Sequence, residues 1–225
     1  GERCVLEIVR HVPSSENDFL VEYDQGVWVA LEFIGGSYSE DVVASISQAQ
    51  TAANAFGQFA LALQDFQAEQ LHHLIPNFHN LEMRFAAFKK VLEQNPLNRT
   101  ALCQDDVDFC LAQQSLVAEL KALDGTIPLR PCHNDTKINN MLFCTKSDSA
   151  KAVIDLDTCM PGYWMFDFGD MVRTFCSPEQ EDSTNLNNVS VRAEIFAAIV
   201  QASVELTQHA LPVAHKPPSS SGTNV

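Results

Sequence analysis

The feature that most constrains the fold of this chain is a polar loop that leads directly into a predicted β-hairpin. Residues 131–143 read PCHNDTKINNMLF, so a polar loop ends in the apolar run 141–144. A second apolar run at 151–154 follows after a polar turn. Two short apolar runs joined by such a turn predict an antiparallel hairpin.

The register of this hairpin decides which polar residues meet. Pairing of Cys144 with Lys151 places Asn140 opposite Asp155, and facing residues have Cα atoms about 4.5–5.5 Å apart. Mg²⁺ prefers oxygen ligands, which a carboxylate and a carboxamide both supply. The sequence therefore predicts a magnesium site formed by Asn140 and Asp155.

The loop in front of the hairpin has the spacing H-x-D-x-x-x-x-N, filled by His133, Asp135 and Asn140. This spacing is typical of a catalytic loop for phosphoryl transfer, in which the protein mainly positions groups and neutralises charge. We expect Asp135 to meet the acceptor hydroxyl and Lys137, two residues later, to reach the transferred phosphate. The alternatives are a chance loop, a buried hydrogen-bonded His133 and a solvated Lys137.

A second motif, Asp167-Phe168-Gly169, matches the tripeptide that holds magnesium in protein kinases. Asp167 lies 12 residues beyond Asp155, after Pro161-Gly162 and at a predicted helix start. An aspartate at a helix start caps backbone N–H groups. We therefore predict a structural role for Asp167 and assign the metal to Asp155.

The remaining sequence predicts an α+β layout. The apolar runs at 4–12 and 19–34 predict strands, with a hairpin turn at Asp24-Gln25-Gly26. A helix capped by Ser39 is expected after Gly35-Gly36. The other predicted helices are 77–94, 104–123, one that begins near Asp167, and 190–209, and the other predicted strands are 127–132, 141–144 and 151–157.

We divide the chain into three predicted parts. The family resemblance described below implies that residues 1–36 are a remnant of an N-terminal β lobe with its hinge, and residues 37–211 a mostly helical C-terminal catalytic lobe. Residues 212–225 have the composition of a disordered tail.

Composition excludes some partners. The formal net charge is −15, from 14 Lys and Arg against 29 Asp and Glu, so nucleic-acid binding is not expected. Seven cysteines occur without a C-x-x-C pair, which favours buried apolar cysteines in a reducing compartment. We find neither a signal pattern nor a run of 18 apolar residues, and we predict a cytoplasmic protein without a membrane partner.

The runs HNDTKINNMLF and VIDLDTCMPGYWMFDFGDMVRTF together resemble the aminoglycoside phosphotransferase and choline kinase superfamily, a phosphotransferase enzyme family. Within it, the sequence is most similar to sugar kinases of the N-acetylhexosamine 1-kinase type. The resemblance covers residues 131–175, and VWVALEFIGGSYSE more weakly resembles the preceding strand, hinge and first helix. It implies a protein-kinase-like fold whose β N-terminal lobe is truncated, because no G-x-G spacing and no lysine precede Lys89.

The resemblance also implies roles for individual residues, with ATP and Mg²⁺ as cofactors. Asp135 becomes the catalytic base, assisted by Lys137, and Asn140 and Asp155 become the magnesium ligands. The other residues assigned in this way are Glu32 and Ile34 for the nucleotide, Asp157 and Arg173 for the substrate, and His133 and Asp167 for bracing the loop. Trp164 follows Pro161-Gly162 and is a candidate for stacking on a sugar ring.

Three classes of function are compatible with these patterns. The prediction is a kinase that transfers the γ-phosphate of ATP to a sugar hydroxyl, specifically the anomeric hydroxyl of an N-acetylhexosamine. The alternative is a non-catalytic fragment or pseudokinase without the nucleotide-clamping glycine loop and lysine. A protein kinase is disfavoured, because the loop reads H-N-D and no A-P-E segment follows. The identity of the sugar and the oligomeric state stay open.

Overall fold

The computed structural model describes residues 6–210, with side chains through residue 205. Within these residues the chain forms two compact units. Unit 1 contains residues up to 65, residues 135–157 and residues from 167 onward, and unit 2 contains residues 66–134 and 158–166. The architecture is a mixture of helices and small antiparallel sheets, so the predicted α+β class is confirmed. The predicted tail at 212–225 lies outside the described residues.

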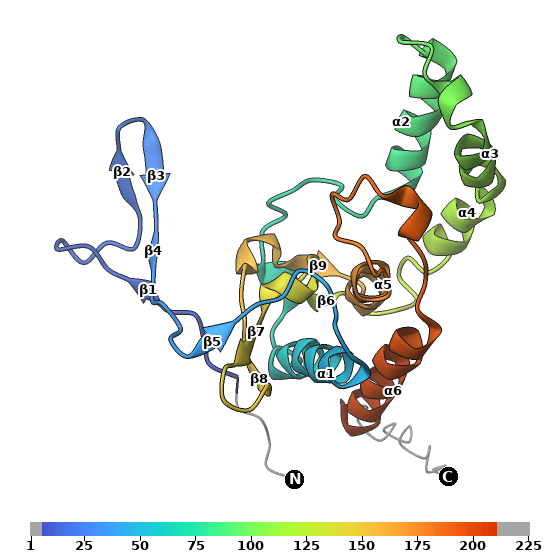
Figure 1. The fold of residues 1–225 in the computed structure, drawn as a ribbon. Coiled ribbons are helices and arrows are strands. Elements are labelled where there is room, and N and C mark those ends of the chain that lie inside the picture. Colours follow the sequence, from blue (N-terminus) through green and yellow to red (C-terminus); the bar gives the residue numbers. More distant parts are fainter. Residues whose placement is uncertain (1–5, 211–225) are drawn as a thin grey trace, which may run out of the picture. The chain divides into compact units, whose positions relative to one another are not determined.

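Four short strands form two ribbons at the start of unit 1. Strand β1 (His11–Val12) pairs with β4 (Ala30–Leu31), and β2 (Val21–Tyr23) pairs with β3 (Gly26–Trp28), both antiparallel (Figure 1). Asp24 and Gln25 link β2 to β3 with φ values of 47° and 62°. Positive φ at both central residues is the geometry of a two-residue hairpin turn. The predicted turn is therefore confirmed.

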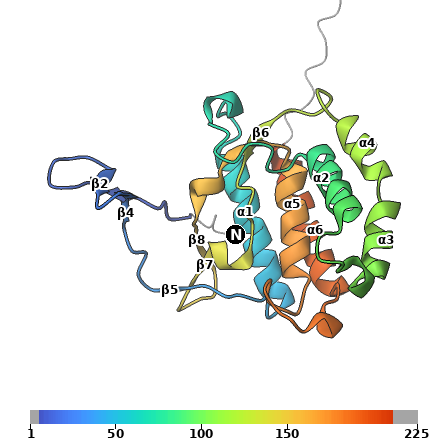
Figure 2. The ribbon, with the colours of Figure 1, turned by 90° about the horizontal axis from the view of Figure 1, so that it is seen from above.

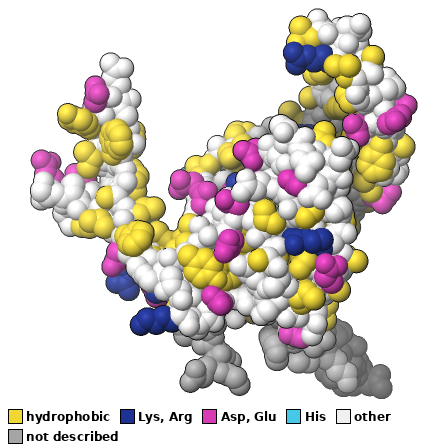
Figure 3. Space-filling view, viewed as in Figure 1, with side chains coloured by type: hydrophobic (Ala, Val, Ile, Leu, Met, Phe, Trp, Pro, Cys, Tyr) yellow, Lys and Arg dark blue, Asp and Glu magenta, His cyan; other side chains and the backbone are white. Residues whose placement is uncertain are grey.

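Large apolar side chains are exposed on these ribbons. Figure 3 shows hydrophobic side chains gathered over β1–β4. The exposed large hydrophobic residues of these strands are Val12, Val21, Tyr23, Val27, Trp28 and Leu31. Two-stranded ribbons of this length are marginally stable by themselves.

A three-stranded antiparallel sheet carries the hairpin that follows the loop at 133–140. Its order is β5 (Ser37–Tyr38), β7 (Met141–Cys144) and β8 (Ala150–Val153). The 3₁₀ helix η3 (Ile138–Asn140) leads into β7, and η4 (Leu156–Thr158) follows shortly after β8. The sheet thus positions both ends of the predicted magnesium site.

The predicted register of this hairpin is wrong. Met141 pairs with Val153 and Leu142 with Ala152, but Phe143 pairs with Ala150, so Lys151 is an extra residue of β8. The Lys151 carbonyl instead accepts a hydrogen bond of 2.7 Å from the N–H of Glu7, and its ammonium pairs with the Glu7 carboxylate at 3.2 Å. A bulge of this kind shifts the register by one residue.

The core of unit 1 lies between the sheet and three helices. Helix α1 (Ile46–Ala62) lies beside α6 (Ala193–Ala210), and α5 (Trp164–Phe175) adds its 167–175 portion (Figure 1 and Figure 2). Helix α1 buries Ala49, Ala52, Ala53 and Ala55, small residues that allow close helix packing. Phe143, Phe175 and Met171 fill the centre of this core.

Two predicted boundaries in unit 1 are wrong. Helix α1 begins at Ile46, and Ser45 rather than Ser39 caps it, with its hydroxyl accepting from the Gln48 N–H at 3.1 Å. Serine favours either position, so composition alone did not separate the two. The strand predicted over 151–157 ends at Val153, because Asp155 adopts a positive φ of 60° that a strand does not accommodate.

Unit 2 contains the remaining helices and a two-stranded sheet. Strand β6 (Arg130–Cys132) pairs antiparallel with β9 (Met160–Gly162). The helices are α2 (Leu81–Gln94), α3 (Gln104–Ala112) and α4 (Ser115–Lys121), with the 3₁₀ turns η1 (Ala68–Gln70) and η2 (Thr100–Leu102). A further 3₁₀ turn, η5 (Leu186–Asn188), belongs to unit 1.

Three more predicted helix boundaries differ from the structure. The helix predicted over 77–94 begins at Leu81, because the Asn80 side chain caps it by accepting from the Met83 N–H. The single helix predicted over 104–123 is divided at Gln113 and Gln114 into α3 and α4. Helix α5 begins at Trp164, so Asp167 lies in its first turn and not at its start. Across residues 6–210, none of the helices combines the length and apolarity needed to span a membrane.

Candidate active site

Asp135, Lys137 and Asn140 form one hydrogen-bonded cluster in the loop before β7. The Asn140 side-chain amide donates to the Asp135 carboxylate at 2.9 Å and to the Asp135 backbone carbonyl at 2.8 Å. The Lys137 ammonium lies 3.1 Å from the same carboxylate oxygen, Oδ2. The Asn140 N–H donates to the Lys137 carbonyl at 3.1 Å, which closes the loop as a 3₁₀ turn. The turn therefore brings together three residues predicted to act together.

Asp155 follows the residue that pairs with Asn140. The Ile154 N–H donates to the Asn140 carbonyl at 2.9 Å, so Asn140 faces Ile154 in the ladder and not Asp155 as predicted. Asp155 is exposed and has a φ of 60°. A non-glycine residue in this left-handed region stores roughly 1–3 kcal/mol of backbone strain. This conformation takes the Asp155 side chain out of the alternation of the strand.

The donor atoms present are compatible with a magnesium ion. Both amide hydrogens of Asn140 point to Asp135, so the side-chain group left for a cation is the carbonyl oxygen Oδ1. Asp155 adds a solvent-exposed carboxylate close enough to act on Lys137 by its charge. Among the described side chains there is no cluster of three His, Cys, Asp or Glu suited to a metal, so a phosphate-bound, partly hydrated ion is the kind that fits.

The Lys137 ammonium stays protonated across the neutral range. Partial burial lowers its pKa, but the hydrogen bond and charge of Asp135 and the charges of Glu181 and Asp155 together raise it. A protonated lysine at this place can donate to phosphate oxygens.

Thr136 connects the loop at 133–140 to α5. Its hydroxyl donates to the Asp167 backbone carbonyl at 2.7 Å and contacts an Asp170 carboxylate oxygen at 3.4 Å. Asp167 is only 4% exposed, as expected for a structural residue rather than an open metal ligand. Its predicted bracing role stays a prediction. Thr136 itself was not predicted, although its place between Asp135 and Lys137 was a usable signal.

Arg173 is held by two carboxylates. Its guanidinium donates to Asp170 Oδ1 from Nε and Nη2 at 3.0 and 2.7 Å, and to Glu181 Oε1 from Nη1 at 2.6 Å. Desolvation lowers the pKa of Arg173, but these hydrogen bonds to Asp170 and Glu181 raise it. These contacts are those of an ordinary ion-pair network, and the predicted substrate role of Arg173 stays a prediction. Asp170 and Glu181 were both missed by the sequence reasoning.

The residues that precede Asp135 belong to unit 2. His133 and Asn134 are buried, and the His133 carbonyl accepts from the Thr158 hydroxyl at 2.7 Å. The Asn134 amide donates to the carbonyls of Cys132 and Thr158 at 3.1 and 3.0 Å. A side chain at Gly162 would approach the Asn134 Oδ1 to 3.3 Å, so this glycine makes room for Asn134. Asn134 has a φ of 65°, a second left-handed residue next to the loop.

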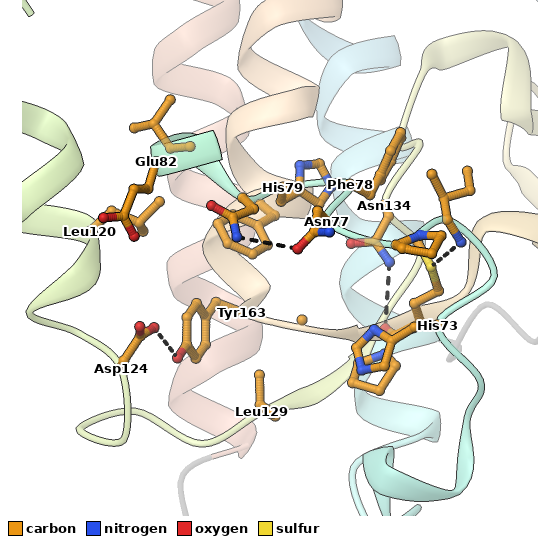
Figure 4. A pocket seen from close by; sticks show the side chains of 18 of the residues that line it. His73, Asn77, Phe78, His79, Glu82, Leu120, Asp124, Leu129, Asn134 and Tyr163 are labelled. Atoms are coloured by element: carbon orange, nitrogen blue, oxygen red, sulfur yellow. Dashed lines mark hydrogen bonds between the residues drawn. The ribbon is translucent and has the colours of Figure 1, made fainter. Parts of the chain in front are cut away.

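Unit 2 contains a cavity of about 520 Å³ with aromatic and polar walls. Figure 4 shows Tyr163 with its hydroxyl bonded to Asp124, at 3.0 Å, and Asn134 among the lining residues. The other labelled lining residues are His73, Asn77, Phe78, His79, Glu82, Leu120 and Leu129. His73 and His79 thus place two imidazole rings in the wall of this cavity. Aromatic faces beside polar groups suit a ligand with an apolar face and hydroxyl edges.

The remaining predicted residues belong neither to the hydrogen-bonded cluster of Asp135, Lys137 and Asn140 nor to the lining of the cavity in unit 2. Glu32 is exposed and its N–H donates to the Arg10 carbonyl at 2.8 Å, while the Ile34 carbonyl accepts from the Ser37 hydroxyl. Asp157 is exposed within η4. Trp164 is half-buried at the start of α5 and does not line the cavity of unit 2, whereas its neighbour Tyr163 does. Their assigned roles stay predictions.

The helices and small sheets form a kinase-like fold, which solved phosphotransferase structures share. The chain belongs to the phosphotransferase enzyme family, whose sequence model matches residues 9–203. The predicted family and the protein-kinase-like fold are thereby confirmed.

Two solved structures illustrate the fold. An aminoglycoside phosphotransferase from Alicyclobacillus acidocaldarius subsp. acidocaldarius has a TM-score of 0.51 and 16% sequence identity, over 88% of this chain and 58% of that one. A spectinomycin phosphotransferase, solved as an AMP-bound complex, has a TM-score of 0.50 and 14% identity, over 89% of this chain and 62% of that one. This chain therefore spans less than two thirds of the length of either relative.

Proposed function

We propose that this chain carries the catalytic centre of an ATP- and Mg²⁺-dependent small-molecule kinase. The observation that carries the proposal is the shared carboxylate oxygen of Asp135, which accepts from both Asn140 and Lys137. Two donors on one oxygen fix the carboxylate in place, as a general base requires. The AMP found with the spectinomycin phosphotransferase supports an adenine nucleotide as the phosphate donor.

Each residue of the cluster has a distinct task in this proposal. Asp135 accepts the proton of the acceptor hydroxyl, and Asn140 orients that carboxylate through the two amide hydrogen bonds. Lys137 donates to the transferred phosphoryl group as negative charge moves across its oxygens. Asn140 Oδ1 and the Asp155 carboxylate would hold magnesium, which when bound neutralises the charge of the nucleotide phosphates.

For the acceptor we propose a sugar, specifically the anomeric hydroxyl of an N-acetylhexosamine. The likeness of the runs 133–143 and 153–175 to sugar 1-kinases supports this choice.

The test is a phosphoryl-transfer assay with Mg-ATP and a panel of acceptors. The panel contains N-acetylglucosamine, N-acetylgalactosamine, an aminoglycoside and an amino alcohol, and the product is located by phosphorus NMR. We expect transfer to the anomeric position of an N-acetylhexosamine and a loss of roughly 10²–10⁴-fold in kcat for Asp135→Asn. Asp106→Asn, an exposed carboxylate of α3, is the matched control and should retain the wild-type rate.

Each result has a defined meaning. Transfer to another acceptor on the panel would replace the sugar proposal and leave the kinase proposal in place. If Asp135→Asn kept the wild-type rate, the assignment of the base would be wrong. If the chain transferred phosphate to none of the panel, the non-catalytic alternative would be favoured.

A further inference from the structure

A ring of charged and polar contacts begins and ends on the catalytic loop of unit 1. It runs from Asp135 to Lys137 at 3.1 Å, then to Glu181 at 3.9 Å. Glu181 accepts from Arg173, which donates to Asp170, and Asp170 contacts Thr136 at 3.4 Å. Thr136 lies between Asp135 and Lys137 in the chain, so the ring closes on the loop itself.

Glu181 is the member that joins the loop to α5 by charge. Its two carboxylate oxygens are divided between the two cations, with Oε1 on Arg173 and Oε2 beside Lys137. Arg173 is in turn held by Asp170, whose side chain is only 12% exposed. The direction of the Glu181 carboxylate is therefore set from the α5 side.

The segment that carries Glu181 is built to hold its shape. Glu179 accepts from Ser183 at 2.6 Å and from the side-chain amides of Asn185 and Asn188. The hydrogen bond from Ser183 lowers the pKa of Glu179 most, and the bonds from the two amides lower it further. The Glu179 carboxylate therefore stays charged in this cluster. Glu179 lies two residues before Glu181, so these hydrogen bonds hold the backbone close to Glu181 in place.

The start of the same segment is anchored to the core. The Arg192 guanidinium donates to the carbonyls of Phe175, Ser177 and Val43 at 2.7, 3.0 and 2.7 Å. Three carbonyl acceptors on one guanidinium fix the chain where it leaves α5. The segment that carries Glu181 toward Lys137 is therefore held in place both by the hydrogen bonds of Glu179 and by those of Arg192.

A cavity of about 690 Å³ opens beside these residues, and Lys137, Arg173 and Glu181 all line it. Lys137 has one close carboxylate partner, Asp135, and a second, Glu181, on the cavity side. If Asp135 were its only partner, the ion pair would keep the Lys137 ammonium on the Asp135 carboxylate, and the carboxylate would be less able to accept a proton. A second anion gives Lys137 an alternative counter-ion when the base is engaged.

We propose that Glu181 is a positioning residue for the phosphoryl transfer proposed above. Held by Arg173, it sets the place of the Lys137 ammonium beside Asp135. This inference rests on the proposed function for its kinetic effect, but the contact between Glu181 and Lys137 is testable without any substrate.

The first test measures Lys137 directly by competitive acylation with acetic anhydride, followed by mass spectrometry of the Lys137 peptide across pH. The charges that face Lys137 are those of Asp135, Glu181 and Asp155. Removing one of them in Glu181→Gln should shift the midpoint of acylation to lower pH and speed labelling at a given pH. Asp182→Asn removes the same charge from the next residue, which forms no ion pair with Lys137 in the described structure, and should leave the midpoint unchanged.

The second test is kinetic. We expect Glu181→Gln to lower kcat by roughly three- to fivefold, the scale of a partly exposed ion pair, with little change in KM. Asp182→Asn should stay within about twofold of wild type, and thermal melts of both variants should match.

The two tests separate this inference from the proposed function. An unchanged Lys137 acylation midpoint in Glu181→Gln overturns the positioning role, whatever the activity assay shows. A shifted midpoint with an unchanged kcat also overturns it, because Glu181 then contacts Lys137 without serving transfer. Absence of activity in the wild-type chain would defeat the proposed function, while the acylation result would still decide the Glu181–Lys137 contact.

Discussion

At the scale of single residues, the position of the Asp135 carboxylate is set by the hydrogen bonds that its neighbours donate. Asn140 directs both amide hydrogens to Asp135, and Lys137 adds a charged donor to the same carboxylate oxygen. Sequence spacing identified all three residues, because a loop with fixed spacing places its own members close together. It did not identify Glu181 or Asp170, which reach the same network from 46 and 35 residues further along the chain.

Cys144 gives a residue-scale prediction that depends on pH. Hydrogen bonds from the Ser147 side chain and from the Lys146 backbone lower the pKa of the Cys144 thiol against a smaller effect of desolvation. A lower pKa leaves more thiolate at neutral pH, and the thiolate is the reactive form. Alkylation of Cys144 by iodoacetamide should therefore have a midpoint below the ordinary value of about 8.5.

Peptide mass spectrometry after timed alkylation measures this midpoint for each cysteine. Ser147→Ala should move the Cys144 midpoint upward, because it removes the largest cause of the shift. Cys176 is the internal reference, since burial raises the pKa of its thiol and shields it. A Cys144 midpoint at or above 8.5, or one insensitive to Ser147→Ala, would contradict the account.

At the scale of elements, the packing of α1 against α5 and α6 should carry much of the stability of unit 1. Phe56 of α1 is 3% exposed and its ring centroid lies 6.5 Å from that of Phe175. Phe56→Ala should lower the free energy of unfolding by about 3–5 kcal/mol, since it removes buried contacts and leaves a cavity.

Phe196→Ala in α6 is the matched control, because the same substitution is made at a side chain that is 41% exposed. Its cost should stay below about 1.5 kcal/mol. Urea denaturation followed by circular dichroism gives both values. Equal losses for the two variants would show that α1 does not form the core as described.

Among the elements, the sequence predicted the hairpin but not its register. The runs 141–144 and 151–154 predicted a hairpin correctly, because apolar runs and polar turns are local signals. The observed register contains a β-bulge at Lys151, a residue that contacts Glu7, 144 residues away in the sequence, and no local pattern reveals such a contact. Helix boundaries were wrong for a related reason, since several serines and asparagines are equally good caps until packing selects one.

At the scale of the whole molecule, the family and the fold followed from a short, specific run, whereas the cavity of unit 2 did not. Its walls come from α2, α4, β9 and the segment 73–80, and these meet only after folding. Composition was informative about partners but not about sites. The net charge of −15 argues against nucleic acid, yet the two cations of the loop network are already paired with carboxylates.

In the proposed function, Asp155 and the loop at 133–140 hold a magnesium–nucleotide complex. Asp148, in the turn before β8, and Asp155, after β8, have left-handed φ values of 53° and 60°. Glycine at either position therefore relieves similar backbone strain. Calorimetric titration of Mg-ATP into the wild-type chain, Asp155→Gly and Asp148→Gly therefore compares the loss of each carboxylate on an equal backbone footing. We predict that Asp148→Gly binds like wild type and that Asp155→Gly loses about tenfold or more in affinity without losing stability. Wild-type affinity for Mg-ATP in Asp155→Gly would contradict the account.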